Sequence, residues 1–233
     1  MTDWRIWGLV IYLVAQGLML ALALYARGYY KNKESKLAAY AEKEEGVFEV
    51  RTTRTLAKDV AFIGIGAALA TALTVALGPI SIGIAGVNTR LSYPVMPTLA
   101  VLYDPFIAAI SSTIASFLGD ALLGWLAPWT LATIATGFIA TWITGTIIRD
   151  PRKLWITIPV LLIQGILGSV YVGWVLDLSG VVPFAVMFPS TLLGHLPWDV
   201  VGTPIIMNLL YARGFFYRPK VTLPSLKAAQ APK

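Results

Sequence analysis

Ionisable side chains are rare within the apolar runs of this 233-residue chain, and four of them fall near run ends that we assign to one side of a membrane. Such groups are costly at membrane depth unless they face a partner or a cavity. Tyrosine and tryptophan lie close to them in the sequence, and aromatic walls with a few polar anchors suit a small, partly apolar organic ligand. The candidate substrate-binding residues are Asn88, Arg90, Tyr93, Asp120, Trp125, Trp129, His195, Trp198 and Asp199.

Each of these residues also has a purely structural interpretation. Arg90 can extend to the outer headgroups or pair with Asp120, which can also cap a helix end. His195 and Asp199 are four residues apart and can share a helix face, although Pro197 lies between them. Tryptophans near span ends are typical interface anchors. The sequence leaves both interpretations open.

Catalytic motifs do not accompany these residues. A nucleophilic triad would need His195, Asp199 and a serine, but the chain has no GxSxG turn. It also lacks HExxH and the phosphate-binding GxxxxGK[ST]. With no cysteine and one histidine, thiolate and multi-histidine metal sites are excluded, and no cofactor is expected. An intramembrane enzyme using His195 and Asp199 remains an alternative to a binding protein, and uphill transport would need energy from a gradient or another subunit.

The composition predicts an all-α, polytopic membrane helix bundle. Hydrophobic residues make up 57% of the chain, charged residues 13%, and the mean hydropathy is +0.73. The net charge of +6 does not indicate nucleic-acid binding, because the basic residues cluster between the apolar runs. We therefore expect the lipid bilayer, and no nucleic acid, among the partners.

Seven spans are expected, the first an uncleaved N-terminal transmembrane anchor, residues 1–26, rather than a signal peptide. A cytosolic charged linker, residues 27–58, is rich in helix-forming residues. A six-helix substrate-binding membrane domain, residues 59–212, and a cytosolic tail, residues 213–233, follow. The six core spans are expected at 56–77, 91–103, 106–123, 128–148, 154–176 and 198–212.

The region from 181 to 211 carries four prolines and is too long for one ordinary span. Two spans would leave the basic tail outside, so we predict one final span preceded by a broken segment, residues 181–196, that dips in from the outer face. With this arrangement, 16 of the 18 Lys and Arg residues lie inside. The expected topology is N-terminus outside and C-terminus cytoplasmic, in a prokaryotic plasma membrane.

The span from 56 to 77 carries two rows of small residues. Gly64, Ala68, Ala72 and Ala76 recur every fourth position, and Gly66, Ala70 and Thr74 form a row beside them. Residues four apart share one helix face, so a second backbone can approach each row closely. We predict a docking surface that includes Gly64, Ala68 and Ala72. The extra N-terminal helix is an alternative occupant of that surface.

These features resemble the substrate-binding S components of energy-coupling factor (ECF) vitamin transporters. The similarity covers roughly residues 55–213 and includes the AxxxA motif at Ala68 and Ala72, Gly119-Asp120 at the end of a span, and LPWDVVGTPI at the opening of the last. The N-terminal span is an addition to the family pattern. The resemblance implies that the small-residue face packs against a transmembrane T component and that two ATPase subunits supply the energy. It also places the small-molecule substrate near the outer surface.

The expected function is therefore that of a substrate-specific binding subunit of an ECF-type importer, with no enzymatic activity of its own. It would capture a small vitamin-like molecule outside and deliver it inward with its partner subunits. Besides the intramembrane enzyme, a non-transporting membrane scaffold subunit is an open alternative, for which the outer pocket should be shallow.

Overall fold

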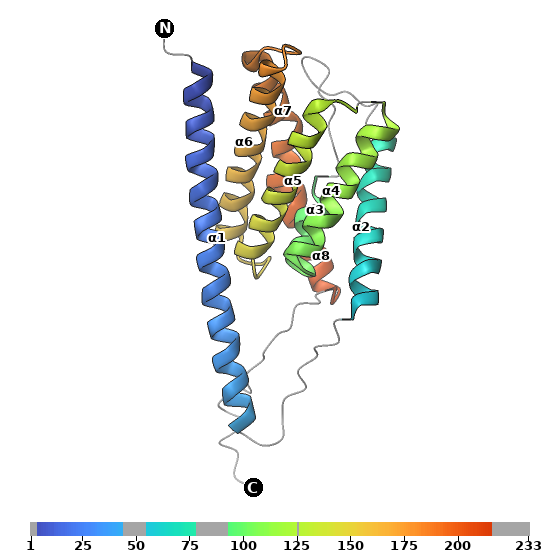
Figure 1. The fold of residues 1–233 in the computed structure, drawn as a ribbon. Coiled ribbons are helices and arrows are strands. Elements are labelled where there is room, and N and C mark those ends of the chain that lie inside the picture. The colour runs from blue at the N-terminus through green and yellow to red at the C-terminus, as the bar shows by residue number, and fades with distance from the viewer. Residues whose placement is uncertain (1–3, 44–54, 78–92, 125, 216–233) are drawn as a thin grey trace.

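The computed structural model describes residues 4–43, 55–77, 93–124 and 126–215, and the regular structure within these ranges is entirely helical (Figure 1). This confirms the predicted helical membrane bundle. In chain order the elements are α1 (Trp4–Lys43), α2 (Leu56–Leu77), α3 (Val95–Leu102), α4 (Pro105–Leu122), α5 (Pro128–Ile147), α6 (Leu154–Leu178), α7 (Phe184–Pro197), the π-helical turn η2 (Trp198–Gly202) and α8 (Thr203–Ala212). Stretches of α1, α2, α4 and α6 are long and apolar enough to cross a membrane.

Helix α1 is longer than the expected anchor. Residues 1–26 account for only its first part, and the helix continues through the polar sequence to Lys43, beyond the end of the bundle (Figure 1). Its upper half packs against α5 and α6 through Tyr12, Met19 and Ala23. The Tyr12 ring stacks on Tyr171 with 4.9 Å between centroids. Among the described residues α1 makes no close contact with α2, which lies across the bundle from it (Figure 1).

The two small-residue rows of α2 face opposite ways. Gly66, Ala70 and Thr74 are buried where α2 packs against α3 and α4. A Cβ atom at Gly66 would lie 2.7 Å from the Leu99 Cδ2 atom, so a larger residue there would require the Leu99 side chain to shift. In contrast, the row formed by Gly64, Ala68, Ala72 and Ala76 is exposed on the outside of the bundle. The row predicted to dock a partner is thus uncovered in the described structure.

Helix α3 is short, and it contacts α2, α4, α5 and α8. Its backbone approaches α5 closely at Gly145. A Cβ atom there would lie 2.6 Å from Ala100 Cβ and 2.8 Å from the Ala100 carbonyl oxygen. Because one of these contacts is with backbone, a side chain at position 145 would have to push the two helices apart.

Gly145→Ala is therefore expected to lower the free energy of unfolding by about 1–3 kcal/mol, the usual cost of overpacking a core. The matched control is Gly17→Ala in α1, where a Cβ atom would meet nothing within 4 Å. This control should gain up to about 1 kcal/mol, because alanine is the better helix former. Thermal unfolding in detergent measures both variants, and equal melting temperatures for the two would contradict the close approach.

The prediction of a broken segment at 181–196 followed by a separate final span is wrong. The chain is helical without interruption from Phe184 to Ala212, with Pro189 and Pro197 inside α7. Local adjustments accommodate the missing proline N–H groups, and here a π-helical turn follows Pro197. The hydroxyls of Ser190 and Thr191 donate to carbonyls of their own helix at 2.8 and 2.9 Å. The prolines therefore lie within the helical segment and do not end it.

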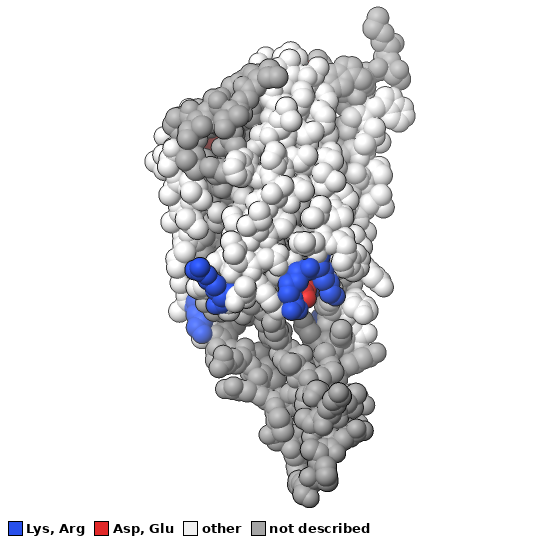
Figure 2. Space-filling model, turned by 180° about the vertical axis from the view of Figure 1, so that it is seen from behind, with Lys and Arg blue, Asp and Glu red and all other residues white. Residues whose placement is uncertain are grey.

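Positive charge gathers at one end of the bundle. Figure 2 shows the described Lys and Arg side chains of that face in one band, with an almost uncharged surface above it. The turn between α5 and α6 contributes Arg152, whose guanidinium donates two hydrogen bonds of 2.9 and 3.0 Å to Asp150. This contact lowers the pKa of the Asp150 carboxyl below its ordinary value. The Asn208 side-chain amide donates to the Pro151 carbonyl at 3.2 Å, which ties α8 to the same turn.

Candidate ligand-binding cavity

A cavity of about 690 Å³ lies among α2, α3, α4, α5, α6 and the α7–η2 segment. Its lining includes Asp120 near the end of α4, Ala127 just before α5 and Leu176 near the end of α6. These three positions lie away from the basic turn at 149–153. The cavity reaches inward to Thr144 on α5 and Leu161 on α6. Its volume falls within the range of about 300–1,000 Å³ typical of small-molecule sites.

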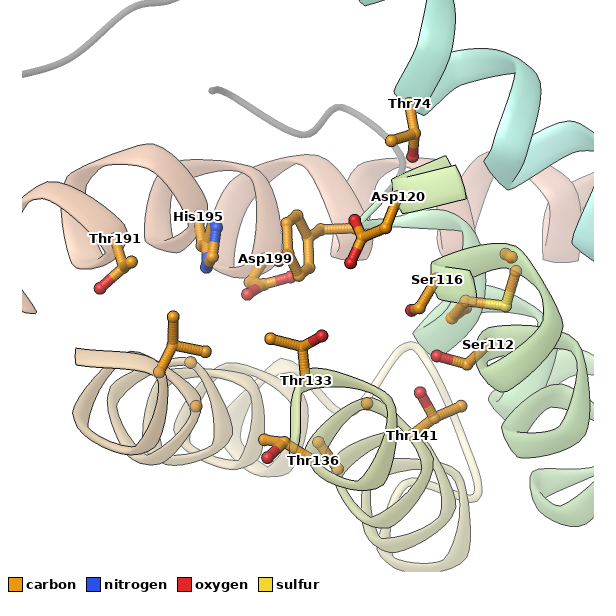
Figure 3. A pocket seen from close by; sticks show the side chains of 18 of the residues that line it. Thr74, Ser112, Ser116, Asp120, Thr133, Thr136, Thr141, Thr191, His195 and Asp199 are labelled. Carbon is orange, nitrogen blue, oxygen red and sulfur yellow. The ribbon is translucent and has the colours of Figure 1, made fainter. Parts of the chain in front are cut away.

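Among the described residues, two carboxyl groups and one imidazole line this cavity, and all three are largely buried. Asp120 is 3% exposed, and His195 and Asp199 are each 9% exposed. Figure 3 shows all three projecting into the same space, with Asp120 on a different helix from the other two. Tyr93, which precedes α3, packs its ring on the His195 imidazole with 4.0 Å between centroids. These groups could hold a ligand by hydrogen bonds and by ring stacking.

Hydroxyl groups form the largest polar class of the lining. Half of the serine and threonine hydroxyls come from one face of α5, and the others lie on α2, α4 and α7 (Figure 3). Some already donate to the backbone, as Thr74 does to the Ala70 carbonyl at 2.8 Å. A hydroxyl that donates in this way can still accept a hydrogen bond from a ligand. The serine and threonine residues of the described lining are Thr74, Ser112, Ser116, Thr133, Thr136, Thr141, Thr144 and Thr191.

The structure thus brings together four of the nine residues predicted to bind a substrate, namely Tyr93, Asp120, His195 and Asp199. Trp198 is half-buried and does not line the cavity. Asn88, Arg90 and Trp125 lie outside the described residues, as does the side chain of Trp129. Ligand contact by these nine residues stays a prediction. Within the described ranges no group of three or more His, Cys, Asp or Glu residues is placed to hold a metal.

Sequence reasoning missed the wall formed by α6. Gln164, Gly165 and Gly168 all line the cavity, on the same helix face as Leu161 and Val172. A Cβ atom at Gly165 would lie 3.4 Å from Asp199 Oδ2, in van der Waals contact with the carboxyl group. The available signal was Gln164, a polar side chain in the middle of a long apolar helix.

A helix bundle with a cavity of this size, on which a few polar groups converge, is typical of proteins that bind a small molecule. The sequence matches a family model described as "ECF-type riboflavin transporter, S component" over residues 54–211. The chain therefore belongs to the ECF S components, the substrate-binding subunits of multi-pass transporters in the plasma membrane. No curated protein and no solved structure matched in the corresponding searches.

Proposed function

We propose that this chain binds riboflavin or a close flavin relative at the outer face of the membrane and delivers it inward. Its partners in this proposal are a transmembrane T component and two ATPase subunits. The observation that carries the proposal is the cavity, enclosed by the same residues, 54–211, that match the riboflavin S-component family. The chain's lack of a nucleotide-binding motif fits a subunit whose energy is supplied by others.

The lining favours an uncharged ligand with a ring and several hydroxyl groups. Among the described lining residues there are two carboxyls and one imidazole, but no Lys or Arg. A phosphate group would meet these two acidic side chains on the described part of the lining. Riboflavin carries a flat ring system for the aromatic and aliphatic walls and a polyhydroxyl chain for the threonine and serine hydroxyls. Its phosphate ester would be the poorer ligand.

The proposed orientation follows from charge. The band of Lys and Arg in Figure 2 would face the cytoplasm, because cytoplasmic loops carry the excess of basic residues. The cavity end marked by Asp120 and Ala127 would then face outward. This orientation puts the N-terminus outside and the C-terminus in the cytoplasm, and it suits capture of a ligand from outside.

The exposed row on α2 is the proposed docking surface for the T component. Gly64, Ala68 and Ala72 present almost no side chain there, so a partner helix could approach closely. Because α1 lies on the other side of the bundle, the additional helix would leave this row accessible.

Fluorescence titration of the purified protein with riboflavin tests the proposal. Flavin emission should be quenched with one-to-one stoichiometry and a dissociation constant of about 1 μM or tighter, which corresponds to about −8 kcal/mol. Riboflavin phosphate should bind at least about tenfold more weakly, because its negative charge would lie close to the two acidic side chains of the lining. Absence of saturable quenching by riboflavin would contradict the proposed function.

A further inference from the structure

Arg149 follows the end of α5 and contacts α1. Its guanidinium carbon lies 4.9 Å from the centroid of the Tyr30 ring, a cation–π contact that joins the two helices. Arg149 is half-buried, and none of the described residues accepts a hydrogen bond from its side chain. Its Nε atom is enclosed, whereas its two terminal nitrogens are not. Arg149 is therefore a positioned cation with no anionic partner among the described residues.

Arg152, in the same turn, has a different environment. Its guanidinium lies 5.0 Å from the centroid of the Tyr211 ring on α8, so a tyrosine of a neighbouring helix contacts each arginine of the turn. The Asp150 carboxylate, however, accepts two hydrogen bonds from Arg152. Asp150 is the one acidic residue in the sequence from 149 to 153. The turn thus carries one arginine whose charge is neutralised and one whose charge is not.

The adjacent part of α1 adds positive charge. Arg27 is exposed and lies three residues before Tyr30, so the two share a helix face. The next charged residues along the helix, Lys31 and Lys33, are also basic. Arg27 and Arg149 therefore both lie near the Tyr30 ring, and cations gathered in this way attract an anion.

These residues lie at the level expected for phospholipid headgroups. The apolar span of α1 ends at Asn32, and the basic band borders an almost uncharged surface (Figure 2). Tyr29 on α1 is 55% exposed, and Trp155 in the first turn of α6 is 75% exposed. Exposed tyrosine and tryptophan are enriched where a membrane meets water. Basic pockets between membrane helices on the cytoplasmic side bind lipid headgroups.

We propose that Arg149 and Arg27 bind the phosphate of an anionic phospholipid between α1 and the turn that joins α5 to α6. The terminal nitrogens of Arg149 donate to the phosphate oxygens, and Arg27 adds charge from α1. Residues 1–53 precede the family match, so this site belongs to the additional helix and not to the family core alone. The lipid would stabilise the contact of α1 with the core. Neither arginine lines the cavity, so this site is separate from the proposed flavin site.

Native mass spectrometry of the full-length protein in detergent, with either dioleoylphosphatidylglycerol or dioleoylphosphatidylcholine added, tests the proposal. The wild type should bind one phosphatidylglycerol at least about tenfold more tightly than phosphatidylcholine, since only phosphatidylglycerol has a net negative charge. Arg149→Gln should abolish this preference, and Arg27→Gln should reduce it. Arg149→Lys keeps the charge but loses the planar guanidinium, so it should retain part of the preference. The lysine variant also serves if the glutamine variant does not fold.

Arg152→Gln is the matched control. Arg152 also lies over a tyrosine ring in the same turn, but Asp150 already neutralises its charge. This variant should keep the wild-type preference for phosphatidylglycerol. The same lipid should raise the melting temperature of the wild type and of Arg152→Gln, but not that of Arg149→Gln, because a bound ligand stabilises the folded state.

A wild type that binds the two lipids equally would overturn the proposal. Equal loss of preference in Arg149→Gln and Arg152→Gln would overturn it too, since the attraction would then come from the whole basic band. Inorganic phosphate should release no more bound phosphatidylglycerol than chloride does at the same ionic strength. Specific release by phosphate would mean that the site takes free phosphate and not a lipid.

Discussion

Replacing Ala68 and Ala72 together by tryptophan should reduce riboflavin uptake to background, a loss of at least about 100-fold, while riboflavin binding by the isolated subunit stays unchanged. Both residues are exposed on α2 and lie on the row that presents almost no side chain. Two indole rings would hold a partner helix away from this row, and overpacking a close helix contact costs about 1–3 kcal/mol at each site. The measurement is uptake of tritiated riboflavin by proteoliposomes that contain the subunit, its T component and the ATPases.

The control variant carries two tryptophans at another pair of exposed positions with the same spacing. Ile158 and Leu162 on α6 have the same spacing and are each 37% exposed. Ile158→Trp with Leu162→Trp should transport riboflavin at the wild-type rate. Undiminished transport by the Ala68 and Ala72 variant would show that the row on α2 is not the coupling surface.

Gly168→Trp should abolish riboflavin binding, with a loss of affinity of at least about 100-fold, or 2.7 kcal/mol. Gly168 lies on the cavity face of α6, and a Cβ atom there would meet nothing within 4 Å. An indole at this position can therefore enter the open space without displacing the surrounding helices, and it would occupy volume that the ligand needs. Fluorescence titration with riboflavin measures the loss.

Gly17→Trp is the matched control, because a Cβ atom at Gly17 likewise meets nothing within 4 Å but the residue lies on α1 outside the cavity. This variant should bind riboflavin normally. Both variants should keep the helical circular dichroism of the wild type. Riboflavin binding by a folded Gly168→Trp protein would mean that the ligand lies elsewhere.

Most of the helices could be predicted from the sequence, because long apolar runs end at charged or glycine- and proline-containing turns. The start of α4 at Pro105 and the starts of α5 and α6 agree with the expected spans to within one residue. The end of α1 is harder to predict. Its polar second half has good helix formers and no helix breaker before Gly46, so nothing in the sequence separates it from the apolar first half. The sequence predicts a break before residue 197 because prolines commonly end helices, and this prediction is wrong. A π-helical turn follows Pro197, and a local adjustment of this kind is not visible in a linear pattern.

The cavity could be predicted only in part. Ionisable groups stand out in an apolar sequence, so the sequence predicts Asp120, His195 and Asp199 without showing that they lie close together. Gln164 and the threonines of α5 carry no charge, and a single threonine is common in membrane helices for packing alone. Whether these residues line a cavity depends on which faces of α5 and α6 pack together. That packing involves contacts between residues far apart in the sequence.

Native mass spectrometry of the full-length protein, isolated with its partners from membranes supplied with riboflavin, tests the central claim most directly. We expect an assembly of this chain with one T component and two ATPase subunits, together with a species heavier by the mass of one riboflavin. Detection of the chain alone, with no riboflavin bound, would contradict its assignment as the riboflavin-binding subunit of an ECF-type importer.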